Sequence, residues 1–306
     1  MVDRDDVLRA RPVVESHLAR TPMLACRTLG ARLKCELFQR TGSFKSRGAL
    51  HKLSTLTPEE RSRGVIAISA GNHAQAVAFA AGEYGVDALV VMWQGASEQK
   101  IAATRAYGGT VDLEASDPAG AFERLHELLE RTGRTLVHPF DDPVVLAGAG
   151  TVGLEIEEDA PDADVVVVPV GGGGLIGGIQ AALAPNPTMR VVAVEPEGSR
   201  ALAAALAAGK PVPVTPVSIA DGLNAPFAGR IAIELCRDLE HVVVTEDEIE
   251  EGFRFLYARA KLACEPSGAV AAAAILAGKI DAERPVAVVS GGNVSARTTS
   301  DILVSR

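Results

Sequence analysis

The 306-residue chain lacks an excess of basic charge, long apolar runs and a rich supply of aromatic residues. Its 30 lysine and arginine residues are outnumbered by 39 aspartate and glutamate residues, giving a formal net charge of −9 instead of the basic surface of a nucleic-acid binder. No window approaches the run of about 18 apolar residues that a membrane helix requires. The N-terminal segment is charged and shows no apolar core of a secretory signal. We therefore expect a cytoplasmic protein that binds neither nucleic acid nor membrane.

Cysteine is also scarce and carries no recognisable motif. The four cysteines form no C-x-x-C pair and have no histidine at zinc-like spacing, so we expect reduced thiols without a metal role. They are Cys26, Cys35, Cys236 and Cys264. Glycine, in contrast, supplies 30 residues. So many glycines direct attention to places where the backbone approaches a ligand closely.

Short apolar runs alternate with helical patterns along the chain, which is typical of an α/β fold with a largely parallel sheet. The expected strands are residues 65–69, 88–93, 165–170, 191–195, 241–245 and 286–290. Helical periodicity predicts helices over residues 73–81, 122–129 and 201–208, and Thr245 with Glu248 forms a capping box that opens another. Length alone suggests about two domains or one large α/β unit. Because no long linker is visible, a second domain must arise from an excursion of the chain.

A run of four glycines follows one of these strands and precedes a helical pattern. It consists of Gly171, Gly172, Gly173 and Gly174. Such a glycine loop exposes several backbone N–H groups at the positive end of a helix, which suits a phosphate dianion, whereas a flexible turn is the simpler alternative. Residues 172–177 also match G-x-G-x-x-G, and Glu195 ends the next strand at about the spacing of a dinucleotide site. Taken alone, the loop fits a nicotinamide dinucleotide as well as another phosphate ligand.

Three further segments place small residues beside polar ones. Lys45 lies among small residues next to Phe44; a solvated surface lysine is the simpler interpretation, but a desolvated lysine can form a Schiff base with a carbonyl compound. The segment from Ser69 to His73 offers either N–H donors for a carboxylate or an ordinary helix cap by its polar residues. Ser290 begins a turn of small residues at the end of the last strand. Together these segments supply the parts that pyridoxal phosphate needs to act on an amino acid.

The sequence resembles the fold-type II pyridoxal-phosphate enzymes of the threonine and serine dehydratase group, which are related to serine racemases. The resemblance rests on motifs that follow one another in order: GSFKSRGA, SAGNHAQAVAFAA, HPFDD with GTVGLEI, VPVGGGGLIGG and SGGN. It implies an α/β fold like that of the tryptophan synthase β-chain, with two open, mostly parallel twisted sheets and helices on both faces. A small mobile domain (residues 50–137) would be inserted into a large cofactor-binding domain (residues 1–49 and 138–306). A homodimer is also implied.

The same resemblance implies roles for individual residues. Lys45 would bind pyridoxal 5′-phosphate as a Schiff base and then move the α-proton of the substrate. Phe44 would pack on the cofactor ring, Asn72 would hydrogen-bond its phenolic oxygen, and Ser290 would face its pyridine nitrogen. The glycine loop would hold the phosphate, with Gly222 in a loop that flanks the cofactor. The residues implied around the substrate are Ser43, Ser69, Ala70, Gly71, Asn72 and His73.

The expected reaction is α,β-elimination of water from a β-hydroxy amino acid, L-threonine or L-serine or both, giving a 2-oxo acid and ammonia. A serine cannot keep the pyridine nitrogen protonated as a carboxylate would, and the weaker electron sink suits β-elimination. In the related serine racemases a second serine stands where this chain has Ala70. Since a methyl group cannot donate a proton, we favour a dehydratase over a racemase.

Other departures from the family pattern bear on metal binding, regulation and specificity. Glu195 and the carbonyl of Ser199 stand at the position of a family cation site, but Ala201 replaces its second carboxylate, so we expect no metal site and treat Glu195 as a surface acid. The chain stops soon after Asn293, so we expect no appended regulatory domain and no feedback inhibition by isoleucine through one. The segment from residue 224 to 227 departs from the family's cofactor-flanking loop, which leaves the exact substrate open.

Several alternatives remain at this point. On the same fold, a serine racemase, a hydroxyaspartate dehydratase or a dehydratase of another hydroxy amino acid is possible. A nicotinamide-dependent oxidoreductase would use the glycine loop and Glu195 but leave Lys45 unexplained. A non-catalytic amino-acid sensor would be expected to lose Lys45, which is present.

Overall fold

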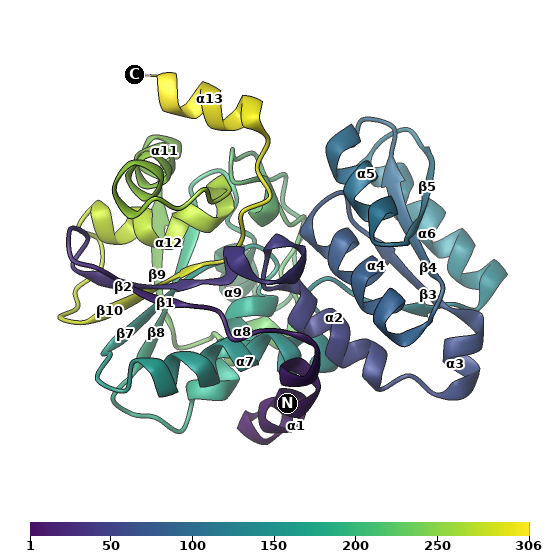
Figure 1. Ribbon diagram of the computed structural model, residues 1–306, viewed down its shortest axis with the longest axis horizontal. Coiled ribbons are helices and arrows are strands. Elements are labelled where there is room, and N and C mark those ends of the chain that lie inside the picture. The colour runs from purple at the N-terminus through teal and green to yellow at the C-terminus, as the bar shows by residue number, and fades with distance from the viewer. Residues whose placement is uncertain (306) are drawn as a thin grey trace.

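The computed structural model describes residues 1–305, which form two open β-sheets with helices packed on them (Figure 1). The larger sheet has the order β1 (Met23–Cys26), β2 (Ala31–Cys35), β10 (Pro285–Val289), β7 (Val165–Pro169), β8 (Arg190–Pro196) and β9 (Glu240–Val244). The smaller sheet has the order β5 (Thr110–Ala115), β4 (Ala88–Trp93), β3 (Val65–Ile68) and β6 (Thr135–Leu136). All neighbouring strands are parallel except β1 and β2. The expected α/β fold with two mostly parallel sheets is confirmed.

Helices cover both faces of the larger sheet, which explains why β7 is an uninterrupted apolar run. On one face lie α1 (Arg4–His17), α7 (Pro143–Asp159) and α8 (Gly174–Leu183), and on the other α11 (Glu246–Phe255) and α12 (Pro266–Leu276) (Figure 1). Val166 and Val168 pack in the core on the α7 and α8 side, whereas Val165 and Val167 pack on the α12 side. The remaining helices of this part are α9 (Ala201–Ala208), α10 (Arg230–Leu235) and α13 (Ala296–Val304), with short helical turns at Glu36–Phe38, Arg40–Gly42, Asp221–Leu223 and Leu256–Ala260.

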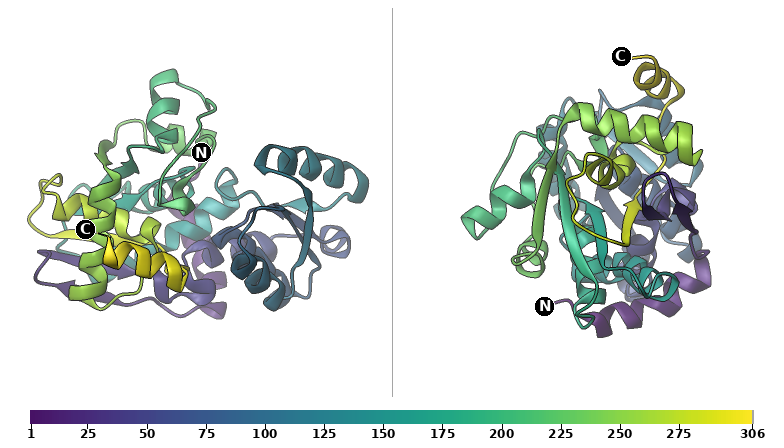
Figure 2. Two further views of the ribbon diagram at one scale, coloured as in Figure 1. Left: turned by 90° about the horizontal axis from the view of Figure 1, so that it is seen from above. Right: turned by 90° about the vertical axis from the view of Figure 1, so that its left-hand side faces the viewer.

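The smaller sheet is likewise covered on both faces, by α4 (Asn72–Tyr84) and α5 (Glu98–Ala106) on one side and by α6 (Pro118–Thr132) on the other; α3 (Pro58–Arg63) precedes β3. Alternate residues of β3 point to opposite cores: Val65 and Ala67 pack with α4, and Ile66 packs with α6. All its strands lie between residues 65 and 136. The two sheets stand side by side in Figure 1 and in the left view of Figure 2.

Helix α2 (Lys45–Ser54) runs along the seam between the two sheets. Its Leu50 and Leu53 share one apolar core with Val65 of β3 and Val145 of α7. A Cβ atom at Gly48 would lie 2.6 Å from the Val145 carbonyl oxygen, so only glycine permits this close crossing of α2 and α7. The position of α2 is therefore fixed by packing from both sides.

The expected strands are all present within a residue or two of their predicted ends, and the expected helices are present too, although α4 and α6 extend up to four residues beyond the predicted ends. The capping box between Thr245 and Glu248 is confirmed at the start of α11. Strands β1, β2, β5 and β6 were not anticipated. β5 is largely half-buried and alternates polar with apolar residues, and β2 contains Lys34, a charge that interrupts the apolar pattern although its side chain is fully buried. Within residues 1–305, no helix is long and apolar enough to cross a membrane.

Candidate active site

The loop that carries Lys45 is fastened to the end of β10. The Phe44 N–H donates to the Ser290 carbonyl oxygen at 3.2 Å, and Ser43 forms an antiparallel bridge with Gly291. Because α2 begins directly after this loop, Lys45 lies at the carboxyl end of the larger sheet and at the seam between the sheets. This is the edge where open α/β sheets bind ligands.

The amine of Lys45 is withdrawn from solvent. Its Nζ donates to the Pro139 carbonyl oxygen at 2.7 Å and lies 5.2 Å from the centroid of the Phe44 ring. Burial lowers the pKa of Lys45 to about 8, so a larger share of the amine is neutral than in an exposed lysine. The interpretation of Lys45 as a solvated surface lysine is therefore wrong. A desolvated, neutral amine is the form that attacks a carbonyl carbon.

The glycine loop connects β7 to α8 and leaves no room for side chains. A Cβ atom at Gly172 would lie 2.4 Å from the Phe140 ring, and Gly173 has a φ of +92°, a conformation that favours glycine. The first hydrogen bond of α8 runs from the Gly177 N–H to the Gly173 carbonyl oxygen at 2.9 Å, so the preceding N–H groups have no acceptor within the helix. These N–H groups at the positive end of α8 suit an anionic group such as a phosphate.

The turn between β3 and α4 brings Asn72 to the same region. Its N-cap is Gly71, without a side-chain cap, so the alternative of an ordinary cap by Ser69 or Asn72 is wrong. Instead, the Ser69 hydroxyl accepts a hydrogen bond from the Gly71 N–H at 3.1 Å. His73 is buried, and its Nε2 lies 2.8 Å from the Val137 carbonyl oxygen.

Gly222 and Ser290 meet at Ser267, near the start of α12. The Gly222 N–H donates to the Ser267 hydroxyl at 2.9 Å, and the Ser290 hydroxyl lies 3.5 Å from the Ser267 carbonyl oxygen. The structure therefore brings the predicted cofactor residues from both sheets into one region.

Some residues of this region were not anticipated from the sequence. Asn72 donates from Nδ2 to Glu265 at 2.7 Å and accepts at Oδ1 from Asn293 at 2.8 Å. Pro139 and Phe140, which lie between Lys45 and the glycine loop, form part of the HPFDD motif but were given no role. The contacts of Glu265 join residues 193 positions apart, so no local pattern could have signalled them.

Glu195 is not the surface acid that the sequence suggested. It is 1% exposed, and its two carboxylate oxygens accept from the N–H groups of Leu202 and Ala203 at 2.8 and 3.0 Å, at the start of α9. Burial raises the pKa of Glu195 to about 7, although these bonds and Arg200 oppose the shift. Its buried position follows from its place at the end of β8, an inner strand between β7 and β9, next to the start of α9.

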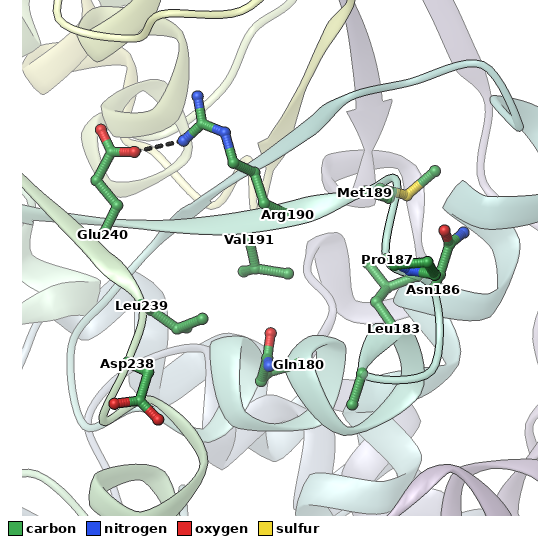
Figure 3. Close-up of a pocket in the computed structure, with 11 residues that line it drawn as sticks. Gln180, Leu183, Asn186, Pro187, Met189, Arg190, Val191, Asp238, Leu239 and Glu240 are labelled. Atoms are coloured by element: carbon green, nitrogen blue, oxygen red, sulfur yellow. Dashed lines mark hydrogen bonds and ion pairs between the residues drawn. The ribbon is translucent and has the colours of Figure 1, made fainter.

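A separate pocket lies at the opposite edge of the larger sheet. Figure 3 shows its lining, which comes from the end of α8, the start of β8 and the segment leading into β9. Its volume is about 350 Å³, and it includes the ion pair between Arg190 and Glu240. Because the strands are parallel, this pocket lies at their amino ends, away from Lys45 and the glycine loop. It has no part in the site described above.

The parallel sheets, the glycine loop and the buried lysine define an α/β enzyme that binds a phosphorylated carbonyl cofactor. Comparison with known families gives a match to the pyridoxal-phosphate dependent enzymes over residues 14–291, and the chain belongs to this family. It is 41% identical to the catabolic L-threonine dehydratase TdcB of Escherichia coli K12, covering 97% of this chain and 95% of that protein. It is also 41% identical to the L-threonine ammonia-lyase of Thermotoga maritima, covering 99% and 78%.

Solved structures agree with this assignment. The chain superposes on maize serine racemase with a TM-score of 0.93 and 35% identity, covering 98% of this chain and 96% of that one. It superposes on the T.th. threonine deaminase with a TM-score of 0.89 and 37% identity, covering 96% and 99%. The cofactor is therefore pyridoxal 5′-phosphate, and the nicotinamide alternative is not supported.

The residues present fit this cofactor. The glycine loop is a cradle in which a Cβ atom at Gly172 would collide with Phe140, and Lys45 is a half-buried residue whose desolvated amine can react with an aldehyde. Within residues 1–305, the buried hydroxyls of Thr41 and Ser43 have no hydrogen-bond partner. Buried polar atoms of this kind are commonly satisfied by a ligand or ordered water.

Proposed function

We propose that the protein removes water from a β-hydroxy amino acid, L-threonine or L-serine or both, and so produces a 2-oxo acid and ammonia. The observation that carries this proposal is the desolvated Lys45 amine at the seam of the sheets, beside a loop suited to phosphate. Relatives named L-threonine dehydratase and L-threonine ammonia-lyase, each 41% identical over nearly the whole chain, support this substrate class.

Lys45 is the residue that acts on the substrate in the proposed elimination. Bound pyridoxal phosphate supplies an electron sink for the α-carbon of the substrate. Lys45 would hold the cofactor covalently, and its free amine would remove the α-proton of the substrate as a general base. Departure of the β-hydroxyl with a proton yields water, and hydrolysis of the resulting enamine gives the 2-oxo acid and ammonia.

The remaining predicted residues bind and orient the cofactor and the substrate. The glycine loop holds the phosphate with backbone N–H groups, which matters in a chain of net charge −9 that offers no general attraction for an anion. Phe44 would pack against the ring, Asn72 would donate to the phenolic oxygen and Ser290 would face the pyridine nitrogen. Ser43 and the turn formed by residues 69–73 surround the substrate carboxylate.

A serine racemase is the second candidate, because the chain superposes closely on maize serine racemase. Racemisation needs an acid on the face of the substrate opposite the base. The resemblance places that acid at Ala70, which lies in the turn between β3 and α4 and has no proton to give. The missing hydroxyl favours elimination. A hydroxyaspartate dehydratase would share the same machinery and differ in the side-chain pocket.

The test is a substrate panel assayed with the purified enzyme and saturating pyridoxal phosphate. We expect 2-oxo acid and ammonia in equal amounts from L-threonine, L-serine or both, and little product from D-serine or 3-hydroxyaspartate. Borohydride treatment should fix the cofactor on the peptide containing Lys45, and the K45A variant should lose turnover and labelling. A protein that binds these amino acids without turnover would be a sensor, and the proposal would fail.

We also propose that turnover needs no divalent cation. Both oxygens of Glu195 are engaged by backbone N–H groups, and the family's second carboxylate position is Ala201. Activity should be unchanged after dialysis against a chelator. A loss of activity that magnesium restores would contradict this proposal.

A homodimer in the cytoplasm is the assembly and location we propose. All four cysteines are buried free thiols, which fits a reducing compartment. The dimer rests on the resemblance to the dehydratase group. Sedimentation equilibrium should give twice the mass of one chain, and cell fractionation should recover the protein with cytoplasmic markers.

A further inference from the structure

The side-chain amide of Asn72 is held at both ends by residues that come from the other side of the seam. Asn72 begins α4, which covers the smaller sheet, whereas Glu265 precedes α12 and Asn293 follows β10 of the larger sheet. The Asn72 Nδ2 donates to the Glu265 Oε1 at 2.7 Å, and the Asn293 Nδ2 donates to the Asn72 Oδ1 at 2.8 Å. These are direct side-chain hydrogen bonds between the two parts of the molecule.

The chain of hydrogen bonds fixes which way the Asn72 amide points. The Asn293 Nδ2 also donates to the Thr41 carbonyl oxygen at 2.7 Å, and a carbonyl oxygen can only accept. One hydrogen of the Asn293 Nδ2 is used in this bond. The other points at Asn72 and needs an acceptor there, so the Asn72 atom that faces Asn293 is Oδ1. Asn72 consequently presents Nδ2 to Glu265, and one of its two hydrogens remains free for a further acceptor.

Glu265 is held firmly in place. It is 3% exposed, its N–H donates to the Gly291 carbonyl oxygen at 3.1 Å, and a Cβ atom at Gly291 would lie 2.4 Å from its Oε1. The absence of a side chain at Gly291 thus makes room for the carboxyl group. The same Cβ atom would also lie 3.2 Å from the Asn72 Nδ2, so both partners depend on this glycine.

The charges around Glu265 come from both sides of the seam. Burial and the nearby Asp221 raise the pKa of Glu265 to about 7, while the hydrogen bond from Asn72, the Lys100 ammonium and the Asn293 N–H oppose the shift. Lys100 belongs to α5 and forms an ion pair with Asp221 of the larger part. The carboxyl group therefore lies where contacts between the two parts converge.

We propose that Glu265 is a positioning residue for the cofactor: with Asn293 it locks the Asn72 amide so that its remaining Nδ2 hydrogen points at the phenolic oxygen of pyridoxal phosphate. This inference rests on the proposed function of Asn72. Glu265 touches neither substrate nor cofactor in this assignment and acts through Asn72 alone. Because the lock also joins the two parts of the molecule, binding of the cofactor and approach of the two parts are coupled.

The test is a double-mutant cycle between E265A and N72A. Affinity for pyridoxal 5′-phosphate is measured by titrating the cofactor-free protein and following the visible absorption and protein fluorescence. E265A removes the buried acceptor and leaves the Asn72 donor unpaired, so we expect affinity to fall about 10- to 100-fold and the absorption band to shift. In the N72A background, E265A should lower the cofactor affinity less than about threefold further, because the Asn72 amide through which Glu265 acts is absent.

Two further variants make the result specific. E265Q keeps a carbonyl oxygen as acceptor and should recover much of the affinity lost in E265A. Glu195 is as buried as Glu265 and has a similarly raised pKa, but its hydrogen bonds come from backbone N–H groups of α9 and the Nδ1 of His241 lies 3.9 Å from its Oε2, so E195Q should lower stability without changing the absorption band. If E265A does not fold, N293A replaces it in the cycle, since it removes the other bond to Asn72.

The outcomes separate this inference from the proposed function. An effect of E265A that is equal in the wild-type and N72A backgrounds would mean a general structural role and would overturn the inference. The same holds if E265A leaves affinity and spectrum unchanged while L-threonine is still consumed. A protein that binds the cofactor with the expected coupling but produces no 2-oxo acid would overturn the proposed function and leave the inference supported.

Discussion

Arg47 lies two residues after Lys45 and is fully buried between two carboxylates. It bonds to Glu36 at 2.8 and 2.9 Å and to Glu155 at 2.7 and 2.9 Å, and Lys34 also bonds to Glu155 at 2.6 Å. Arg47, Glu36 and Lys34 have no exposed surface, and Glu155 is 7% exposed. The cluster of two cations and two carboxylates is neutral as a whole, which makes its burial tolerable.

The variant R47M removes one cation and leaves a carboxylate charge unbalanced in the interior. Breaking a buried pair by removing one partner typically destabilises a protein by about 3–5 kcal/mol. Methionine fills part of the space, so the expected loss comes from charge and hydrogen bonding more than from a cavity. We expect the free energy of unfolding of the holoenzyme to fall by about this amount at neutral pH.

Urea unfolding followed by circular dichroism measures the effect, with R131M as the matched control. Arg131 pairs with Glu127 on the surface, and their side chains are 59% and 53% exposed, so its loss should cost less than about 1 kcal/mol. A change in R47M of the same small size would refute the reasoning, because it would show that the buried carboxylates do not need Arg47.

The pH dependence gives an independent check. Burial alone would raise the pKa of Glu155, but the charges of Arg47 and Lys34 outweigh it, and the pKa is lowered from its usual value of 4.5. A depressed carboxyl pKa contributes stability that is present above the unfolded pKa and lost as the pH falls through the folded one. The difference between R47M and the wild type should therefore shrink below about pH 4.5. A difference that stays constant down to acid unfolding would exclude the electrostatic explanation.

Three further predictions concern the site itself. G172A should weaken pyridoxal phosphate binding at least about tenfold in a fluorescence titration, since its Cβ would lie 2.4 Å from the Phe140 ring; unchanged affinity would mean that the loop does not hold the phosphate. Binding of pyridoxal phosphate by the cofactor-free protein requires the neutral amine of Lys45. The rate of binding should therefore rise about tenfold from pH 6 to 7 and level off above the pKa of about 8. A rate that keeps rising toward pH 10 would contradict the desolvated amine. A70S restores the hydroxyl of the serine racemases and should increase racemisation of L-serine, measured by chiral chromatography; no gain would weaken the argument from Ala70.

Features that depend on neighbouring residues could be predicted from local sequence patterns. The glycine loop lies between a short apolar run and a helical pattern, and the capping box at Thr245 needs only four residues. Motifs alone also singled out Lys45 and Asn72. Long-range contacts could not be predicted: the apolar stretch around Glu265 fits burial, but its partner Asn72 is 193 positions away.

Charged residues in the core were the main source of error. Lys34 breaks the apolar pattern of β2, and Glu195 stands at a strand end where an acid is usually exposed. Lys34 is satisfied by Glu155, 121 positions away, whereas Glu195 is satisfied by backbone N–H groups seven and eight residues later, in the first turn of α9. A pattern of hydrophobicity cannot record such partners, since it scores each residue by itself.

The hydrogen bonds that hold the Lys45 loop stay within the larger part of the molecule, whereas those of Asn72 join the two parts. Lys45 is anchored through Arg47 and Phe44 to elements of the larger sheet, so its amine keeps its place relative to the glycine loop and Ser290. Asn72, in contrast, belongs to the smaller part and is tied to the larger one only through side chains such as Glu265. If the smaller domain moves as predicted, the lysine and the phosphate cradle stay together while Asn72 arrives with closure. The hydrogen bond from Asn72 to the phenolic oxygen would then form only when the site is closed.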